Sequence, residues 1–239
     1  MAGDRSRRRA RAGQAGRRGR PGPGRTLNEQ QVVDAAVALL DREGHGALSV
    51  RAVAAELGVQ PNALYTYVAD RAALEAAIVE RVLTEANLKL LRGPARSWRR
   101  RIASYAGSLR RALLSRPGAV PLFLTAPMTG PVALEVGERL LQALGDSGLE
   151  ARDAARACWM LIVYVLGSAA LDVAETDGRA PLPSERERTS ERLAGFRTVD
   201  PQAFPLTLEA APLMAAWVST SQFRWGLDRI LDGITTSRL

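Results

Sequence analysis

The chain has few residues of the kinds that build disulfides, metal centres and nucleophilic catalytic sites. It contains one cysteine, Cys158, and one histidine, His45, among 239 residues. A single cysteine cannot form an intramolecular disulfide or a cysteine-rich zinc site, which fits a reducing compartment. We see no cluster of His, Cys or paired carboxylates with metal-ligand spacing, so we expect no metal ion and no cofactor. His45 lies between two glycines, and we interpret it as a surface-turn residue.

The sequence also lacks a hydrophobic run long enough to span a bilayer. Between Arg156 and Asp172, an apolar run of fifteen uncharged residues covers 157–171, whereas a membrane-spanning helix needs about 20. We therefore interpret this run as a buried helix and expect no membrane partner. The first 25 residues contain no apolar stretch that could act as a secretory signal. We expect a cytoplasmic protein.

Alternating polar and apolar residues, the pattern of a half-buried strand, do not extend over a useful length anywhere in the chain. Apolar residues instead recur at helical intervals and are interrupted by glycine and proline. The sequence therefore predicts an all-α fold.

The excess of positive charge is confined to one end of the sequence. Residues 1–25 contain nine arginines and one aspartate, while residues 26–92 contain six basic and nine acidic groups. The first 25 residues are rich in Arg, Gly, Ala and Pro, so we expect a disordered arm that contacts nucleic-acid phosphates. Within it, Arg18-Gly19-Arg20-Pro21 resembles the core of an AT-hook, which lies in the minor groove. A solubilising tail is the alternative interpretation of the arm. Four residues in an arginine-rich tail match easily by chance, so we favour a non-specific phosphate contact and leave the minor-groove contact open.

Residues 26–72 contain the residue types that typically start and end helices, at positions that predict three helices. Asn28 and Gln31 have capping-box spacing, and the apolar repeat that follows them stops at Gly44. Ser49 is a good cap for a second helix, which Gly58 ends, and Pro61 suits the first position of a third. Two short helices joined by a tight turn and preceded by a longer packing helix predict a helix-turn-helix domain.

The predicted third helix has one face that is suited to DNA. At about 100° per residue, its apolar face points toward the other helices, and Tyr65 lies on the boundary. The residues that point away are Asn62, Ala63, Thr66 and Tyr67. An amide, a methyl, a small hydroxyl and a phenol match base edges and phosphates, although an ordinary amphipathic surface helix would look similar. Arg51 lies off the apolar stripe of the second helix, on the face that is available to approach the DNA groove.

The run from Leu27 to about Glu80, with the stretch LGVQPNALYTYVADR, resembles the DNA-binding domain of the TetR family of transcriptional regulators. The resemblance implies that Arg51, Asn62 and Ala63 face bases. It also implies that the DNA backbone is held by Tyr65, Tyr67 and Arg71, with assistance from Ser49. Gln60 and Thr66 belong to the same expected DNA-binding set. They depart from the residues usual at their positions, which leaves the base sequence open.

Residues 73–239 form the second expected domain, a helical body. We expect a long fourth helix that begins after Asp70 and ends near Gly93-Pro94, spanning about 30 Å. Further helical patterns cover residues 95–115, 131–144, 150–175 and 221–236, and residues 176–207 are predicted to be a loop. The family resemblance implies that this body binds a small-molecule inducer. It also implies that the body forms a homodimer through the helices near 150–175 and 221–236.

Aromatic and large apolar residues in the body are candidates for the wall of a ligand pocket. The predicted lining residues are Tyr105, Leu109, Phe123, Met128, Trp159, Tyr164 and Trp217. We therefore expect a dimeric, ligand-responsive repressor that binds a palindromic operator in double-stranded DNA. Two alternatives remain open, namely a sequence-blind DNA-binding protein driven by the arginine arm and an enzyme that uses the helical body.

Overall fold

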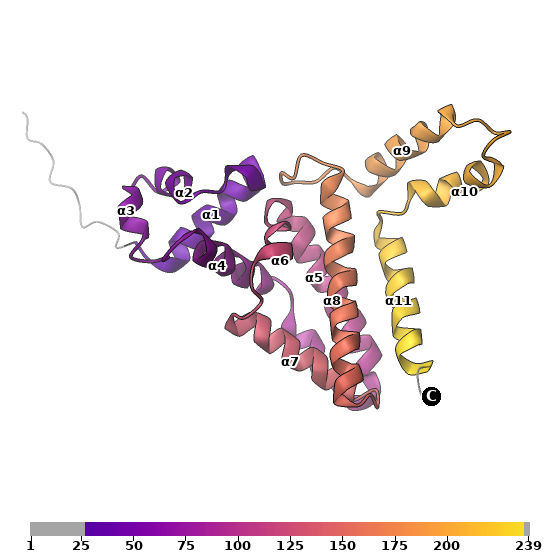
Figure 1. The fold of residues 1–239 in the computed structure, drawn as a ribbon, viewed down its shortest axis with the longest axis horizontal. Helices are drawn as coiled ribbons and strands as arrows, with labels where there is room; N and C mark the ends of the chain where they lie inside the picture. The colour runs from indigo at the N-terminus through magenta and orange to yellow at the C-terminus, as the bar shows by residue number, and fades with distance from the viewer. Residues whose placement is uncertain (1–26, 237–239) are drawn as a thin grey trace, which may run out of the picture.

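The computed structural model describes residues 27–236, and all regular structure within that range is helical (Figure 1). The all-α expectation is confirmed. The head contains α1 (Glu29–Glu43), α2 (Val50–Glu56), α3 (Pro61–Leu64) and the connecting helix α4 (Arg71–Leu83). The body contains α5 (Trp98–Ser115), α6 (Leu122–Thr125), α7 (Pro131–Gly145), α8 (Ala151–Ala174), α9 (Glu185–Gly195), α10 (Pro205–Ala215) and α11 (Thr220–Thr236). Short 3-10 turns occupy His45–Ala47, Leu88–Leu91, Ala95–Ser97, Pro117–Ala119 and Phe196–Thr198. The expected basic arm, residues 1–25, lies outside the described residues.

The helices of the head begin at the residues whose side chains cap them. Asn28 accepts a hydrogen bond from the Gln31 N–H at 2.9 Å, and the Gln31 side chain accepts one from the Asn28 N–H at 3.0 Å. Ser49 caps α2 through the Ala52 N–H, and Asp70 caps α4 through the Ala73 N–H. Each cap satisfies an N–H group that has no partner inside its own helix.

The connecting helix α4 is shorter than the sequence predicted. It ends at Leu83 after 13 residues, which is a length of about 20 Å, and not near Gly93-Pro94. Beyond it the chain turns, because the Asn87 N–H finds a partner in the Ser108 hydroxyl of α5 at 3.0 Å, and the Asn87 side chain caps the next 3-10 turn. The hydrogen bond between Asn87 and Ser108, four residues beyond the end of α4, is a tertiary contact that the local sequence does not indicate.

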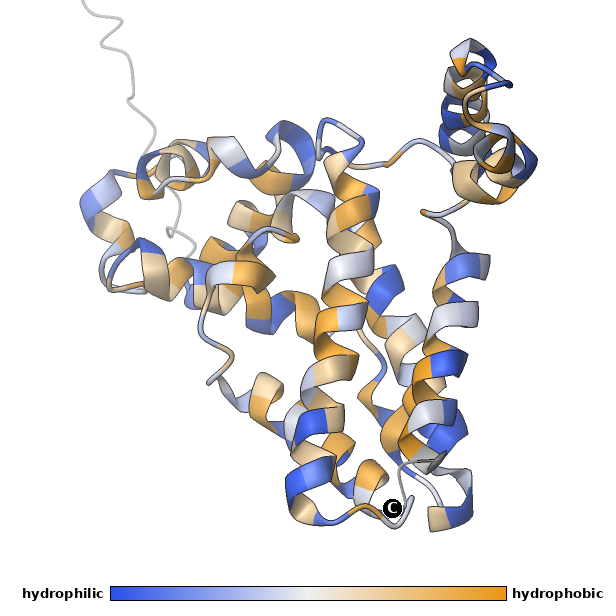
Figure 2. Cartoon of the chain, turned by 45° about the vertical axis from the view of Figure 1, so that its right-hand side comes forward, coloured by the Kyte–Doolittle hydropathy of each residue, from blue (hydrophilic) through white to orange (hydrophobic). Residues whose placement is uncertain are grey.

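Helix α8 is the central helix of the body. It is the one helix in the described part of the chain whose length and apolar composition would allow a membrane crossing, and 44% of its most apolar window is buried inside this chain. Its buried face includes Leu161, Val165 and Ala169 and packs against α5 and α7, whose apolar sides also face inward (Figure 2). We therefore interpret α8 as the core helix of a helical bundle.

The segment predicted to be a loop, residues 176–207, contains helix α9. Its start has a capping box, in which Ser184 and Glu187 bond each other's backbone N–H groups. Together with α10, this helix projects away from the rest of the body (Figure 1). The loop prediction was wrong because α9 is highly charged and has no apolar repeat like those of the core helices.

Candidate DNA-binding surface and ligand cavity

The turn between α2 and α3 sets the orientation of the recognition helix. Gly58 has φ of +66°, a conformation that a residue with a Cβ adopts at a cost. The Val59 N–H then reaches back to the Ala54 carbonyl at 3.0 Å. Leu64 and Val68 are buried in the core of the head, so they fix which side of α3 faces inward.

The opposite side of α3 is open to solvent. Asn62, Ala63 and Thr66 are exposed, as the sequence predicted. Three further members of the expected DNA-binding set are exposed around them, namely Arg51, Gln60 and Arg71. Ser49 is half-buried, because its hydroxyl is used to cap α2. These residues form one contiguous stretch of the head, from the start of α2 to the start of α4.

The two tyrosines exchange the positions that the sequence predicted for them. Tyr65 is 53% exposed, whereas Tyr67 is half-buried and packs against the core of the head. The α-helix ends at Leu64, and the Tyr67 N–H bonds the Leu64 carbonyl at 2.8 Å, three residues back. This tighter turn moves Tyr65 and Tyr67 away from the directions of an α-helix, whereas Thr66 and Val68 keep their predicted exposure and burial.

Arg51 and Arg71 differ in whether their guanidinium groups already form an ion pair within the described residues. Arg51 forms no ion pair within the described residues, so its guanidinium is available. Arg71 lies in the first turn of α4, and its Nε donates to Glu75 at 2.7 Å. Because this pair is largely exposed on the Arg71 side, a phosphate can compete for the guanidinium at small cost.

A partly open apolar cavity lies in the body between α5, α7 and α8, with a volume of about 90 Å³. Four of the residues predicted to line a pocket do line it: Tyr105, Leu109, Phe123 and Met128. The wall also includes Leu83, the last residue of α4. Typical sites for drug-sized ligands measure about 300–1,000 Å³, so the cavity is smaller than such a site.

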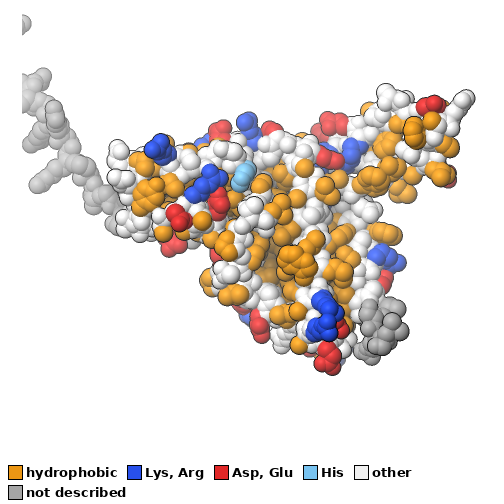
Figure 3. All heavy atoms as spheres, viewed as in Figure 1, with side chains coloured by type: hydrophobic (Ala, Val, Ile, Leu, Met, Phe, Trp, Pro, Cys, Tyr) orange, Lys and Arg blue, Asp and Glu red, His pale blue; other side chains and the backbone are white. Residues whose placement is uncertain are grey.

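Trp159 does not line this cavity. Its side chain is 68% exposed on the outer face of α8, where hydrophobic side chains gather (Figure 3). Because α8 is uncharged over fifteen residues, the sequence could not distinguish its inward face from its outward face.

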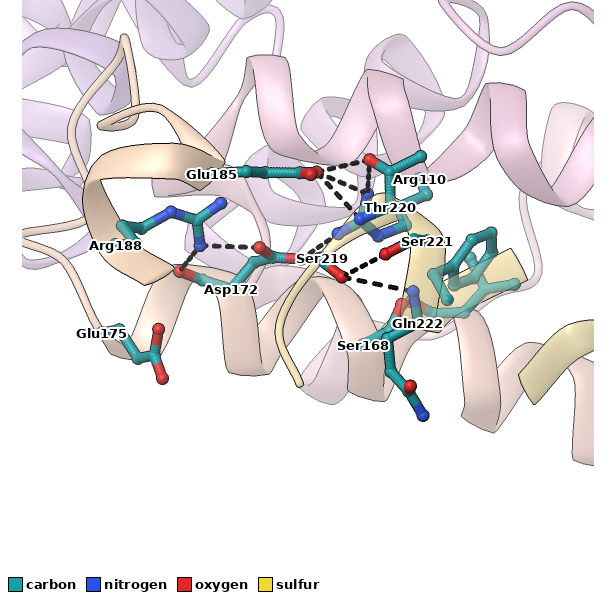
Figure 4. A network of polar contacts seen from close by, with 12 residues as sticks. Arg110, Ser168, Asp172, Glu175, Glu185, Arg188, Ser219, Thr220, Ser221 and Gln222 are labelled. Atoms are coloured by element: carbon teal, nitrogen blue, oxygen red, sulfur yellow. Dashed lines mark hydrogen bonds and ion pairs between the residues drawn. The ribbon is translucent and has the colours of Figure 1, made fainter. Parts of the chain in front are cut away.

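Tyr164 and Trp217 line a different depression, a groove of about 400 Å³ between α8 and the start of α11. The Tyr164 hydroxyl donates to the Phe223 carbonyl at 2.9 Å, and the two rings stack with centroids 5.5 Å apart. Arg110 lies over the other side of this arrangement, 5.2 Å from the Phe223 ring centre, and belongs to a polar network with Asp172 (Figure 4). The expected pocket residues therefore fall into three separate places, namely the cavity, this groove and the outer face of α8.

Helix α4 joins the cavity to the head through contacts that the sequence analysis missed. The Glu80 carboxylate accepts hydrogen bonds from the Val132 N–H at 2.7 Å and the Ala133 N–H at 3.0 Å, and so caps α7, whose next residues line the cavity. Gly130 leaves the space in which this carboxylate lies, because a Cβ there would overlap it. The only feature of the sequence that indicates this contact is that α7 begins at Pro131 without a side-chain cap of its own.

A second contact fixes α1 to the body. Arg116, just after α5, donates to Asp41 on α1 and to Glu85 just beyond α4. Burial raises the pKa of the Asp41 carboxyl, and the hydrogen bond and charge of Arg116 oppose that rise. Within residues 27–236, no group of three His, Cys, Asp or Glu side chains is placed to hold a metal ion.

The sequence matches known bacterial regulators along most of its length. Residues 32–78 match the family described as bacterial regulatory proteins, tetR family, and residues 93–238 match the tetracyclin repressor-like C-terminal domain. The transcriptional repressor DrrR1 of Streptomyces coeruleorubidus is 30% identical over 92% of this chain and 81% of its own. The class A tetracycline repressor of Escherichia coli is 33% identical over 89% of this chain and 93% of its own.

Solved structures agree with these matches. ActR of Streptomyces coelicolor, in complex with (S)-DNPA, superposes with a TM-score of 0.74 at 25% identity, over 88% of this chain and 98% of its own. A second ActR structure, in complex with actinorhodin, gives the same TM-score. These relatives are regulators, and they do not favour the enzyme or the sequence-blind alternative. The chain belongs to the tetR family of bacterial regulatory proteins and is a ligand-responsive, DNA-binding transcriptional repressor.

Proposed function

We propose that the protein represses transcription as a homodimer bound to a palindromic operator, and that a small-molecule inducer entering the α5–α7–α8 cavity releases it. The observation that carries this proposal is the double role of α4. Its first turn holds Arg71 at the DNA-binding surface, and its last residue, Leu83, forms part of the cavity wall. One rigid helix of about 20 Å therefore touches both sites.

Base reading is assigned to the exposed side of α3 and to Arg51. Asn62 can bond adenine through both amide atoms, and the Ala63 methyl can contact a thymine methyl. Tyr65, Thr66 and Arg71 are assigned to the phosphate backbone, which fixes register without reading sequence. The half-buried Tyr67 is assigned a supporting role, with its hydroxyl toward the backbone and its ring on the core.

Dimer formation is assigned to the outer faces of α8 and α11. Trp159, Val163 and Leu171 are exposed along one side of α8, and Trp225 is exposed on α11. Gly167 lies among them, and a Cβ added there would meet no atom of this chain, so the space beside it is open to a neighbouring helix. A run of large apolar side chains exposed on two adjacent helices is typical of a protein interface.

Release follows from the size of the cavity. We expect a ligand larger than about 90 Å³ to displace α7 or α4, and Glu80 fastens these two helices together. Displacement of α4 would change the separation of the two α3 helices, which must be about 34–36 Å to meet successive major grooves. The ligand thereby prefers the conformation that cannot bind DNA, which is the thermodynamic requirement for induction.

Selection of binding sites from random-sequence duplex DNA tests this proposal. The full chain should retain fragments that contain an inverted repeat, with half-site centres about one helical turn apart. Sedimentation of the same sample should give the mass of a dimer.

A matched pair of variants tests the assigned interface. Trp159→Glu should be monomeric and should lose operator binding. Leu134→Glu changes a comparably exposed apolar residue on α7, and this variant should remain dimeric and bind the operator. A monomeric wild type, or selected fragments without two-fold symmetry, would overturn the proposal.

A further inference from the structure

The wall of the α5–α7–α8 cavity is made almost entirely of hydrocarbon. The residues that line it include no charged side chain, and the Tyr105 hydroxyl is the one side-chain oxygen or nitrogen among them. A buried charge needs a counter-charge or several hydrogen bonds, and this wall offers neither. A ligand that carries a formal charge is therefore disfavoured inside the cavity.

The hydroxyl of Tyr105 is buried and has no hydrogen-bond partner within the described residues. Its side chain is 2% exposed, so solvent does not provide a partner either. Buried polar groups in folded proteins are nearly always paired, and leaving one unpaired costs about 1–3 kcal/mol. Tyr105 belongs to the cavity wall, so a ligand atom that reaches this unpaired hydroxyl gains a hydrogen bond.

The Tyr105 hydroxyl can offer a ligand its proton. Burial raises the pKa of Tyr105, so the hydroxyl keeps its proton throughout the physiological range. A protonated phenol can donate one hydrogen bond, and its oxygen can also accept one. The donor role pairs with a ligand acceptor, such as a carbonyl or ring oxygen.

We infer that the cavity selects an uncharged, mainly apolar compound that bears an oxygen acceptor, and that the Tyr105 hydroxyl donates a hydrogen bond to this oxygen. The inference rests on the proposed function, because it names the chemistry of the inducer for the same cavity. It sets this cavity apart from sites that hold a ligand through ionic groups. Tyr105 acts here as the residue that determines specificity.

Two probes that differ by one carbonyl test the inference. Indane and 1-indanone share a bicyclic skeleton, and only 1-indanone carries an acceptor. Titration calorimetry with the full chain gives the affinity of each probe for the wild type and for Tyr105→Phe, which lacks only the hydroxyl. Because the probes' own hydration cancels between the two proteins, the ratio of affinities isolates the hydrogen bond.

The expected result is a loss of about five-fold in 1-indanone affinity in Tyr105→Phe, with indane affinity unchanged or slightly higher. Tyr164→Phe is the matched control, since its hydroxyl already has a partner in the Phe223 carbonyl and lies outside the cavity. That variant should bind both probes as the wild type does. Circular dichroism of the three proteins checks that each substitution leaves the fold intact.

Two different results would overturn the inference, and they are distinguishable. If both probes bind and Tyr105→Phe weakens neither or both equally, the cavity binds apolar ligands but the hydroxyl plays no part, so the proposed function survives. If neither probe binds to the wild type, the cavity does not open to compounds of this class, and the proposed ligand site fails together with the inference.

Discussion

The carboxylate of Asp172 on α8 accepts a hydrogen bond from Arg110 on α5, with Oδ2 and Nη2 2.5 Å apart. The same carboxylate accepts a second hydrogen bond from Arg188 on α9 at 2.7 Å (Figure 4). All three side chains are almost fully buried. Asp172 therefore pairs with two guanidiniums inside the protein, and Glu185 lies 3.9 Å from Arg110. These contacts fasten α9, the base of the projecting α9–α10 segment, to the body.

Removal of Asp172 should be strongly destabilising. Asp172→Ala leaves two buried cations without their carboxylate, and breaking a buried ion pair in this way costs about 3–5 kcal/mol. Urea denaturation should show this loss in the free energy of unfolding. Asp153→Ala, which breaks an exposed pair with Arg156 on the same helix, should cost no more than about 1 kcal/mol. Equal losses in the free energy of unfolding would mean that the buried ion pairs of Asp172 contribute no more to stability than an exposed ion pair.

Asn62 and Arg71 should affect DNA binding in different ways. Asn62→Ala should change the preference at one base pair per half-site by about 1–3 kcal/mol, because an amide reads a base edge. Arg71→Ala should weaken binding to all sequences alike and leave the preferences unchanged. Fluorescence anisotropy with operator duplexes substituted at each position measures both effects. A change confined to one base pair in Arg71→Ala would contradict its backbone role.

The basic arm should control salt dependence and not sequence preference. Residues 1–25 carry nine arginines, whereas residues 26–92 are net acidic. Each phosphate that the arm neutralises adds about 0.9 to the slope of log affinity against log salt. Deletion of residues 1–25 should lower that slope by several units while the operator is still preferred over random DNA. An unchanged slope would show that the arm stays off the DNA.

The head could be predicted closely from the sequence because its helix ends are set by local groups. Asn28, Ser49 and Asp70 each cap the helix that follows them, and Leu64 and Val68 are buried as their spacing predicted. Local caps depend on the residues within one turn, so a sequence displays them directly. The prediction failed at Tyr65 and Tyr67, where a change to 3-10 geometry rotated the side chains.

The body was less predictable because its boundaries depend on distant partners. Helix α4 ends at Leu83, four residues before Asn87 contacts Ser108 of α5, and no local residue marks that contact. The placement of Trp159 failed for another reason: an apolar helix with a core on one side and the proposed interface on the other has no polar face to orient it. Ser184 and Glu187 did mark the start of α9, and their spacing could have been used.

Alkaline conditions should weaken the fold through Tyr105. Burial raises the pKa of this phenol above its ordinary value of 10.0. As pH rises past about 10, the unfolded chain loses the Tyr105 proton while the folded chain keeps it, so the unfolded state is favoured and stability falls. Tyr105→Phe should lose less stability than the wild type between pH 9 and 11.5 when urea denaturation is repeated along that series. Parallel losses in both proteins would show that other groups dominate.

Substitutions at Glu80 and Gly130 should affect stability through the same contact, the hydrogen bonds of the Glu80 carboxylate to the start of α7. Glu80→Ala removes the acceptor for two N–H groups at the start of α7, and the loss of such a cap costs about 0.5–2 kcal/mol. Gly130→Ala should cost a similar amount, because its Cβ would occupy the place of the Glu80 carboxylate. Gly137→Ala is the matched control, since a Cβ in the middle of the same helix meets no other atom within 4 Å, and it should stabilise the protein by about 0.5–1 kcal/mol through helix propensity.

The double variant Glu80→Ala, Gly130→Ala decides whether the two substitutions act on the same contact. Once the Glu80 carboxylate is absent, the Gly130 methyl group has nothing to displace. The double variant should then be no less stable than Glu80→Ala alone, which is a coupling equal to most of the single Gly130→Ala effect. Additive losses in urea denaturation would mean that Gly130→Ala acts through its own backbone, and that Glu80 does not lock α4 to the helix that walls the cavity.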